Sequence, residues 1–376
     1  MDSLACRACH GRTGHLVLDL GQQPACDYFP RADTPGPDPV YPLQMWLCSS
    51  CGLAQLVADP TVPEEPRGAE PAALVAQARD AVERVAAAGL FSGRYRVAEY
   101  GSPHGGSWLD LLTRRGLTPA GDSEPADVVL DCFGMMHEAN QSEALAGRVA
   151  RVAEGGVLLL QYHSLGTIMR FGQWNALRHG HYAYYSTTAL CEMLTRNGFG
   201  PGMAWHFDLY GGTVLLAASR DGDASVLPDG SVPSLLAEEA RIGVRDPEML
   251  ASLQRDARAR ASGLHDWLVA ERCAGRTTLA YGAASRAVAL LRWAAVDRTL
   301  LSAVVDASPA KQGLRMPGTD IPIVGTAELL ARLPDTVLLL VPDLLPEVRA
   351  AFPRIEAAGG RWVTDSETIA AQAADA

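Results

Sequence analysis

Two cysteine pairs near the N-terminus constrain the fold of this 376-residue chain more than any other feature. Cys6 and Cys9 form a Cys-x2-Cys pair, and 38 intervening residues lead to a second such pair, Cys48 and Cys51. At this spacing two thiolates of one turn bind the same tetrahedral ion, and a module this small needs such a cross-link to fold. We therefore predict a structural zinc site with four sulfur ligands. Four unrelated buried cysteines are the alternative.

Composition excludes several classes of protein. The formal charge is −11, and no sustained basic stripe is present, which argues against nucleic acid as a partner. Because the sequence contains neither a run of 18 apolar residues nor a charged-then-apolar leader, we expect a soluble cytoplasmic protein with no membrane partner. Paired cysteines in a reducing compartment favour metal binding over disulfides. Lys311 is the only lysine, a bias typical of a GC-rich genome.

After the cysteine module, predicted strands alternate with predicted helices, which indicates α/β architecture with mostly parallel sheets. A Pro- and acid-rich linker at 59–70 and a polar stretch at 219–245 divide the chain. The predicted domains are residues 1–60, 72–220 and 246–376. Central strands are expected at 97–100, 128–131, 156–160 and 212–218, with helices at 72–88, 107–115, 143–152 and 187–197. In the last domain we expect a helix near 247–272, strands at 277–281, 300–306, 321–324 and 336–341, and a helix at 286–295.

A glycine-rich turn follows the first central strand. The strand ends near Glu99, and the string Gly101-Ser102-Pro103-His104-Gly105-Gly106 leads to a helix that Ser107 is placed to cap. Glycines at such a turn let a ligand approach the backbone closely. The string is not Gly-x-Gly-x-x-Gly and has no Lys, so it fits S-adenosylmethionine better than a phosphate group. A purely structural turn is the alternative. The candidate cofactor-binding residues are Glu99, Gly101, Ser102, His104, Gly105, Gly106 and Asp131.

Three separated strings resemble the sugar C-methyltransferases of antibiotic deoxysugar pathways. They are the N-terminal run from CRAC through LDLGQQPACDYFP to YPLQMWLCSSCGLAQL, the string RHGHYAYYS followed by YGGT, and the string YGAASRAVALL followed by VVDASPAKQG and MPGTDIPIVG. The resemblance spans nearly the whole chain. It implies a zinc-binding head, a central Rossmann-like S-adenosylmethionine domain and a second Rossmann-like C-terminal domain. It also implies methylation of a carbon next to a ketone in a nucleotide-linked deoxysugar.

Such chemistry needs a base for the α-proton and a group that stabilises the enolate oxygen. In the family a Tyr-His-Glu-His string supplies the base, and the resemblance carries this role to His181. An imidazole suits proton abstraction near neutral pH. Arg178 stands at the family's Tyr and could hold an enolate or a diphosphate. His179 and Tyr184 complete the catalytic candidates, and solvated loop histidines are the alternative.

The chain also departs from the family. Gly180 stands at the family's Glu, Tyr210 stands at a family histidine, and the linker lacks the family's active-site tyrosine. Only residues 116–127 separate the helix after the glycine turn from the next strand, which is too short for a crossover and a strand. We therefore expect a reduced sheet without the strand whose acidic end holds the cofactor ribose. Asp122 or Glu124 could substitute from the shortened loop.

The remaining candidates concern substrate binding. In the C-terminal domain Tyr281 and Arg286 flank a strand-to-helix turn, where open α/β sheets bind ligands. That domain could also serve only for packing. The full list of substrate-binding candidates is Tyr28, Tyr210, Gly211, Tyr281 and Arg286.

The leading hypothesis is a C-methyltransferase that uses S-adenosylmethionine and structural zinc. The second is an enzyme on the same scaffold that keeps only proton transfer, as an epimerase, isomerase or cyclase. The third is a non-catalytic partner.

Overall fold

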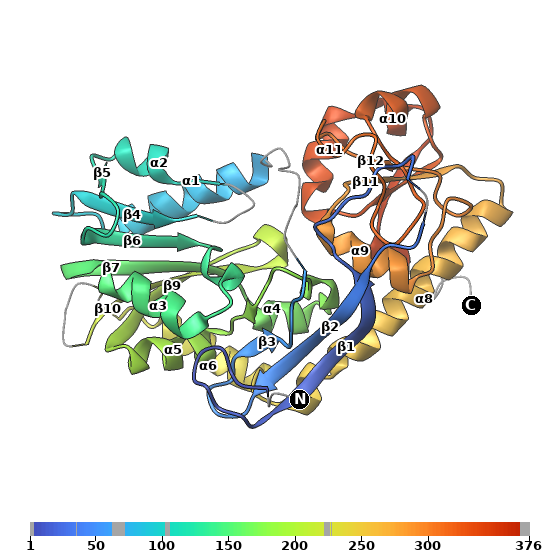
Figure 1. The fold of residues 1–376 in the computed structure, drawn as a ribbon. Helices are drawn as coiled ribbons and strands as arrows, with labels where there is room; N and C mark the ends of the chain where they lie inside the picture. Colours follow the sequence, from blue (N-terminus) through green and yellow to red (C-terminus); the bar gives the residue numbers. More distant parts are fainter. Residues whose placement is uncertain are drawn as a thin grey trace.

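A computed structural model describes residues 4–34, 36–61, 72–101, 106–221, 226 and 228–368, which form three sheets (Figure 1). The N-terminal sheet has the order β1-β2-β3-β8, and its described pairs are antiparallel. Its strands are β1 (Gly14–Pro24), β2 (Val40–Cys48), β3 (Ala54–Leu56) and β8 (Ala183–Tyr184). β8 comes from the middle of the chain, so the head sheet is completed by a segment that the sequence assigned to the central domain.

The six-stranded central sheet has the order β5-β4-β6-β7-β10-β9. Its strands are β4 (Arg96–Tyr100), β5 (Thr118–Pro119), β6 (Ala126–Cys132), β7 (Val152–His163), β9 (Phe199–Phe207) and β10 (Thr213–Arg220). β5, β4, β6 and β7 run parallel, whereas β10 is antiparallel to both of its neighbours. The expected mostly parallel α/β sheet is thus present, and its first four strands end at one common edge.

Helices cover both faces of this sheet. They are α1 (Ala72–Ala87), α2 (Leu109–Thr113), α3 (Gln141–Ala150), α4 (Leu165–Arg170) and α5 (Thr187–Arg196). β7 is apolar on both faces because it is central. Leu159 packs with the buried residues of α1 and α2, and Leu160 packs with those of α3 and α5.

Three elements depart from the sequence expectation. β5 is a two-residue strand inside the segment thought too short for one, and it pairs with β4 at the sheet edge. β9 was not predicted, because Gly200, Pro201 and Gly202 weaken its strand pattern, and the structure tolerates them in an edge strand. Helix α6 (Ser231–Ile242) lies within the stretch expected to be a polar boundary and packs against β9 and α5.

The C-terminal sheet is entirely parallel, with the order β13-β12-β11-β14-β15. Its strands are β11 (Thr278–Tyr281), β12 (Val304–Val305), β13 (Ile323–Val324), β14 (Thr336–Leu339) and β15 (Arg361–Thr364). The helices are α7 (Pro247–Leu250), α8 (Ser252–Cys273), α9 (Ser285–Trp293), α10 (Thr326–Arg332), α11 (Leu345–Ala351) and α12 (Arg354–Ala357). In this doubly wound order the first strand, β11, lies at the centre, and the chain leaves it toward α9.

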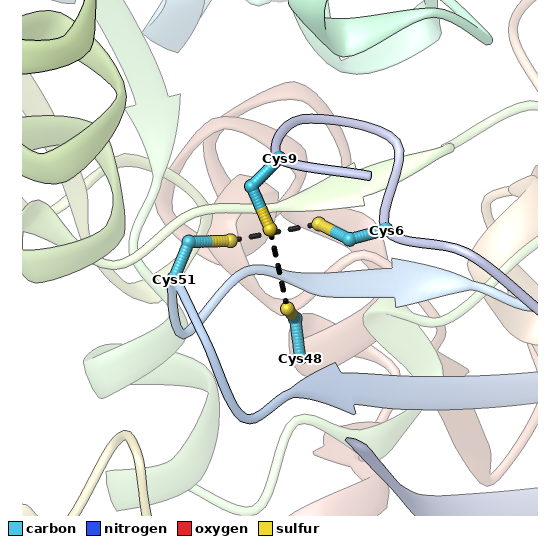
Figure 2. Close-up of side chains that lie close together, drawn as sticks. All are labelled: Cys6, Cys9, Cys48 and Cys51. Atoms are coloured by element: carbon cyan, nitrogen blue, oxygen red, sulfur yellow. Dashed lines mark hydrogen bonds between the residues drawn. The ribbon is translucent and has the colours of Figure 1, made fainter. Parts of the chain in front are cut away.

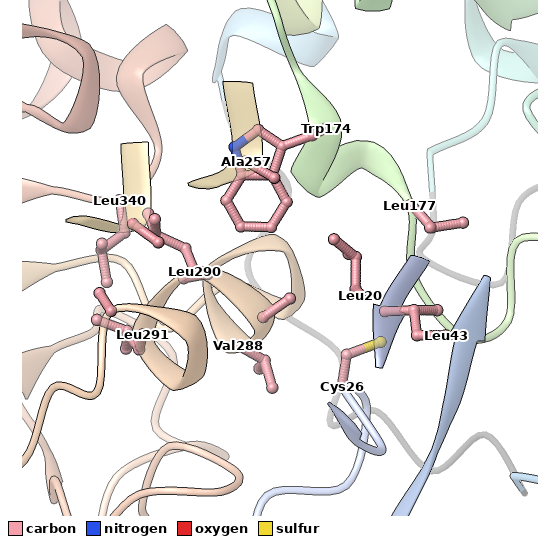
Figure 3. Close-up of a cluster of buried hydrophobic side chains, with 14 of the residues drawn as sticks. Leu20, Cys26, Leu43, Trp174, Leu177, Ala257, Val288, Leu290, Leu291 and Leu340 are labelled. Carbon is pink, nitrogen blue, oxygen red and sulfur yellow. The ribbon is translucent and has the colours of Figure 1, made fainter. Parts of the chain in front are cut away.

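One apolar core joins the head to the C-terminal domain. Leu20 and Leu43 of the head hairpin lie near Val288 of α9 and Trp174, which begins the short helix η2 (Trp174–Ala176) (Figure 3). The backbone oxygen of Leu20 also accepts a hydrogen bond from Trp293 Nε1, at 2.9 Å. The head is therefore packed against α8 and α9 rather than tethered by a linker. Among the described helices, none is both long and apolar enough to span a membrane.

Candidate functional site

The four paired cysteines converge on one point (Figure 2). The sulfur atoms of Cys6, Cys9, Cys48 and Cys51 all lie within 4.8 Å of one another. Cys6 Sγ is 3.5 Å from Cys51 Sγ, and Cys9 Sγ is 3.6 Å from Cys48 Sγ. Zn–S bonds of about 2.3 Å separate the sulfurs of a tetrahedral site by about 3.8 Å. The predicted clustering of the four thiols is confirmed, and the donor set fits a zinc ion.

The loop between the first two cysteines reaches the centre of the chain. Arg7 donates from Nη1 to the carbonyl of Ala139 at 3.0 Å, and its guanidinium lies over the Tyr182 ring, 4.8 Å from the centroid. The head also contacts the loop at 178–182 directly. Asp59 Oδ2 accepts a hydrogen bond from the Gly180 backbone N–H at 2.5 Å. The cysteine module therefore holds the loop that carries the predicted base.

Within that loop the two predicted histidines lie in different surroundings. Arg178 Nε donates to His181 Nε2 at 2.8 Å, with Nδ1 farther away at 3.4 Å. The Tyr184 hydroxyl accepts from the Arg178 backbone N–H at 3.0 Å, so this buried tyrosine holds the loop in place. By contrast, His179 is buried among head residues and contacts the carbonyl of Pro42 at 3.4 Å. Burial lowers the pKa of His179, and Asp59 partly opposes that shift.

Two further histidines, which the sequence analysis did not select, lie at the same place. The His137 ring is 4.6 Å from the His181 ring, and its Nδ1 lies 2.9 Å from the carbonyl of Gly180. His137 ends the short helix η1 (Met135–His137) after β6. His163 is the last residue of β7, and its Nε2 lies 2.9 Å from Gln173 Oε1. Their signal in the sequence was position, since each follows a parallel strand at its carboxyl end.

Positive charge surrounds His163. Its pKa is lowered to about 4, first by burial and next by the charges of Arg286 and Arg178, with hydrogen bonds to Gln173 and the Tyr210 backbone opposing the shift. His163 is therefore neutral at pH 7. Arg178 of the central domain and Arg286 of α9 thus both act on the pKa of His163 through their positive charges.

Tyr210 and Gly211 belong to the short helix η3 (Leu209–Gly211), and Tyr210 contacts both Gln173 and Arg286. Tyr210 has a φ of 56°, and its carbonyl accepts from Gln173 Nε2 at 3.2 Å. The Arg286 guanidinium lies over the Tyr210 ring, 5.6 Å from its centroid. At Gly211 a Cβ atom would lie 2.1 Å from Gln173 Nε2, so only glycine fits there.

The other two substrate-binding candidates lie elsewhere. Tyr281 is buried in the C-terminal core, and its ring centroid is 5.8 Å from that of Phe352 and 6.1 Å from that of Trp362. Substrate binding by Tyr281 therefore stays a prediction, and its ring packs within the C-terminal core. Tyr28 is 48% exposed on the head. Arg286 also pairs with Asp343 of the short helix η4 (Pro342–Leu344) at 3.5 Å.

The cofactor candidates lie at the carboxyl ends of β4 and β6. Glu99 accepts hydrogen bonds from the Trp108 backbone N–H at 2.6 Å and from Ser107 Oγ at 2.5 Å, and thus organises the start of α2. Asp131 forms a buried ion pair with Arg148 at 2.6 Å. Both carboxylates are engaged within the protein. Ser102, His104 and Gly105 lie outside the described residues.

Two features of this edge fit a bound cofactor. Among the described residues, none has an atom within 4 Å of a Cβ atom added to Gly101. The buried Gln161 amide at the end of β7 has no hydrogen-bond partner among the described residues. Of the proposed substitutes for the ribose acid, Glu124 pairs with Arg96, and Asp122 is exposed beyond the short β5.

Two family profiles match this chain. Residues 6–64 match a domain described as a "putative zinc binding domain", and residues 208–365 match the C-methyltransferase C-terminal domain. The two ends of the chain are thus similar to the two end domains of C-methyltransferases. It is also 28% identical over 236 residues to the C-methyltransferase NovU of Streptomyces niveus. That match covers 62% of this chain and only 54% of NovU.

Solved methyltransferases resemble only part of the chain. Magnesium protoporphyrin IX methyltransferase from Synechocystis is 14% identical, with a TM-score of 0.29, over 39% of this chain and 83% of its own. The 1,6-didemethyltoxoflavin-N1-methyltransferase of Burkholderia thailandensis is 17% identical, with a TM-score of 0.26, over 45% of this chain and 96% of its own.

Proposed function

We propose that this chain is an S-adenosylmethionine-dependent C-methyltransferase that acts next to a ketone of a small molecule. The proposed substrate class is a nucleotide-linked deoxysugar, or a related natural-product intermediate. The match of residues 208–365 to the C-methyltransferase C-terminal domain supports the reaction type. The resemblance to sugar C-methyltransferases supports the substrate class.

One observation carries the proposal, namely the contact of 2.8 Å between Arg178 Nε and His181 Nε2. A lone pair and a fixed cation lie side by side there, which is what enolate formation requires. His181 Nε2 takes the α-proton of the substrate, and the positive charge of the neighbouring Arg178 guanidinium stabilises the developing enolate oxygen. Tyr184 holds the backbone of Arg178, and His137 packs edge-on against the base.

When bound, S-adenosylmethionine supplies an electrophilic methyl group. The residues that would hold it are Gly101 and Gly106 with Ser102, His104 and Gly105, while Glu99 and Asp131 shape the turns around them. The four cysteines would hold zinc as a closed structural site, which leaves no open position for catalysis. The zinc ion would stabilise the head, and through Asp59 and Arg7 the head holds the histidine loop.

A second candidate is a proton-transfer enzyme that does not use S-adenosylmethionine. It is favoured by the engagement of Glu99 and Asp131 within the protein and by the two-residue length of β5. The short β5 lacks the acidic end expected to hold a ribose diol, and the carboxylates of Glu99 and Asp131 already bind groups within the protein. His181 and Arg178 would then perform the same proton abstraction without methylation.

Calorimetry and isotope exchange separate these functions. Under the leading proposal, titration with S-adenosylmethionine releases or absorbs heat, and its absence at millimolar ligand would overturn the methyltransferase assignment. A nucleotide-linked keto-deoxysugar in deuterated water should incorporate deuterium at the α-carbon. We expect His181→Ala to slow this exchange by about 10²- to 10⁴-fold, the usual contribution of a general base.

The exposed His206 provides the matched control, and His206→Ala should leave the exchange rate unchanged. Undiminished exchange in His181→Ala would remove His181 from its proposed role. Exchange that proceeds without any binding of S-adenosylmethionine would support the second candidate.

A further inference from the structure

The first turn of α9 reaches into the histidine site from the C-terminal domain. Ser285, the first residue of α9, is buried, and its Oγ accepts a hydrogen bond from Arg178 Nη1. The next residue, Arg286, places its guanidinium over Tyr210. The helix thus contacts the central domain at two consecutive positions.

Arg178 is held at three points. Its backbone N–H donates to the Tyr184 hydroxyl at 3.0 Å, its Nη1 donates to Ser285, and its Nε donates to His181. The guanidinium is planar and its donors have fixed directions. When the backbone and Nη1 are anchored, the direction of the Nε–H is therefore set, and it points at His181 Nε2.

That donor determines the state of the imidazole. A nitrogen that accepts a hydrogen bond carries a lone pair, and the Arg178 contact is shorter at Nε2, 2.8 Å, than at Nδ1, 3.4 Å, which favours the tautomer with its proton on Nδ1. Two aromatic groups also lie beside the ring, His137 at 4.6 Å between centroids and Tyr184 at 6.4 Å. Neither of these two is a permanent cation, whereas Arg178 brings a fixed positive charge to the imidazole.

We propose that Ser285 is a positioning residue, which acts through Arg178 to keep the lone pair of His181 on Nε2. The C-terminal domain thereby prepares the base of the central domain. This role concerns the resting protein and needs no substrate. Only its effect on turnover rests on the proposed methyltransferase function.

Nitrogen NMR of the full chain labelled at histidine tests the proposal without substrate. In the wild type at pH 7, His181 should show one unprotonated nitrogen, Nε2, and one protonated nitrogen, Nδ1. In Ser285→Ala and in Arg178→Gln, the two nitrogen shifts should move toward each other as the two tautomers mix. Ser285→Thr retains the hydroxyl and should restore the wild-type pattern.

The matched control is Ser302→Ala, which removes another serine that accepts a hydrogen bond from an arginine, here Arg332 Nη1 at 3.4 Å on the exposed surface. This variant should leave the His181 signals unchanged. A wild-type pattern in both Ser285→Ala and Arg178→Gln would overturn the proposal. Because the two variants alter different domains, failure of one to fold still leaves the test to the other.

Kinetics provide a second readout that a structural role alone would not move. Ser285→Ala should lower kcat by about 3- to 10-fold, the range of one net hydrogen bond, with KM for S-adenosylmethionine unchanged. In the Arg178→Gln background the same substitution should have no further effect, because Ser285 acts through Arg178. An equal, additive loss in both backgrounds would contradict the proposal.

The two readouts separate the possible failures. Wild-type protein that lacks methyl transfer but shows the predicted NMR coupling would reject the proposed function and retain the role of Ser285. Protein that transfers methyl groups, but whose His181 signals do not change in Ser285→Ala and Arg178→Gln, would retain the proposed function and reject the role of Ser285.

Discussion

The cysteine cluster and the histidine cluster are assembled in opposite ways. All four cysteines belong to one short segment, and two tight turns bring their sulfur atoms together within the head. The histidine cluster draws residues from three parts of the chain. His137, His163 and His181 come from the central segment, Asp59 comes from the head, and Ser285 comes from the C-terminal domain.

This difference shows how a local site can support a distant one. β8 follows directly after His181 and pairs with β3 of the head, while Arg7, between the first two cysteines, contacts Tyr182. The cysteine cluster takes all of its sulfur atoms from the head, whereas the histidine loop is held by contacts that the head supplies. The dependence of one region on the other should therefore run in one direction.

Loss of the metal site gives the largest expected effect. Cys48→Ser, or removal of zinc with a chelator, should unfold the head, because the binding of a structural zinc ion supplies folding free energy to a small module. The His181 NMR signals should then lose their native positions. The exposed Cys273 is the control, and Cys273→Ser should change neither zinc content nor spectrum.

Histidine signals that stay native after zinc removal would show that the two regions are independent. A substitution in the histidine cluster tests whether the metal site depends on that cluster. His181→Ala should leave the zinc content at one equivalent, because His181 supplies no ligand to the cysteine cluster.

A smaller effect is expected where the head loop meets the C-terminal domain. Arg315 and Asp38 form a buried ion pair with two contacts of 2.6 and 2.7 Å. Asp38→Asn leaves a buried guanidinium unpaired, which should lower the free energy of unfolding by about 3–5 kcal/mol. Chemical denaturation measures this change.

The exposed pair of Arg31 and Asp33 serves as the comparison. Asp33→Asn should not shift the denaturation midpoint, since solvent screens that pair. Equal effects of the two substitutions would mean that the head does not depend on its contact with the C-terminal domain.

The smallest effect concerns pH and the histidine cluster alone. The pKa of His163 is lowered to about 4 in the folded protein, below its ordinary value near 6.5. The unfolded chain therefore binds a proton more readily, so the stabilisation is present above about pH 6.5 and is lost as the pH falls toward 4. The loss should reach at most about 3 kcal/mol.

Denaturation curves between pH 7 and pH 4 measure this slope. His163→Gln should make the slope shallower, while His15→Gln, on the exposed head surface, should leave it unchanged. An unaltered slope in His163→Gln would contradict the assignment of a neutral, buried imidazole.

Several sequence predictions were correct for reasons that are local. The spacing of the cysteines predicted their convergence, and apolar strands between amphipathic helices predicted the central and C-terminal sheets. β9 and α6 were missed because edge strands tolerate Gly and Pro, and because a short helix on a polar background has a weak pattern. The role predicted for Tyr281 stays a prediction, because position at the end of a strand does not say toward which face a side chain points.

The sequence by itself determined the cysteine cluster, the α/β class and the family, since each depends on residues close together in the chain or on repeated patterns. Only the tertiary structure decided that His181 meets Arg178, His137 and Ser285, that His163 is held neutral, and that Asp131 is already paired with Arg148. These contacts join residues distant in sequence, and the packing of three domains fixes their geometry. No spacing in the chain encodes such contacts directly.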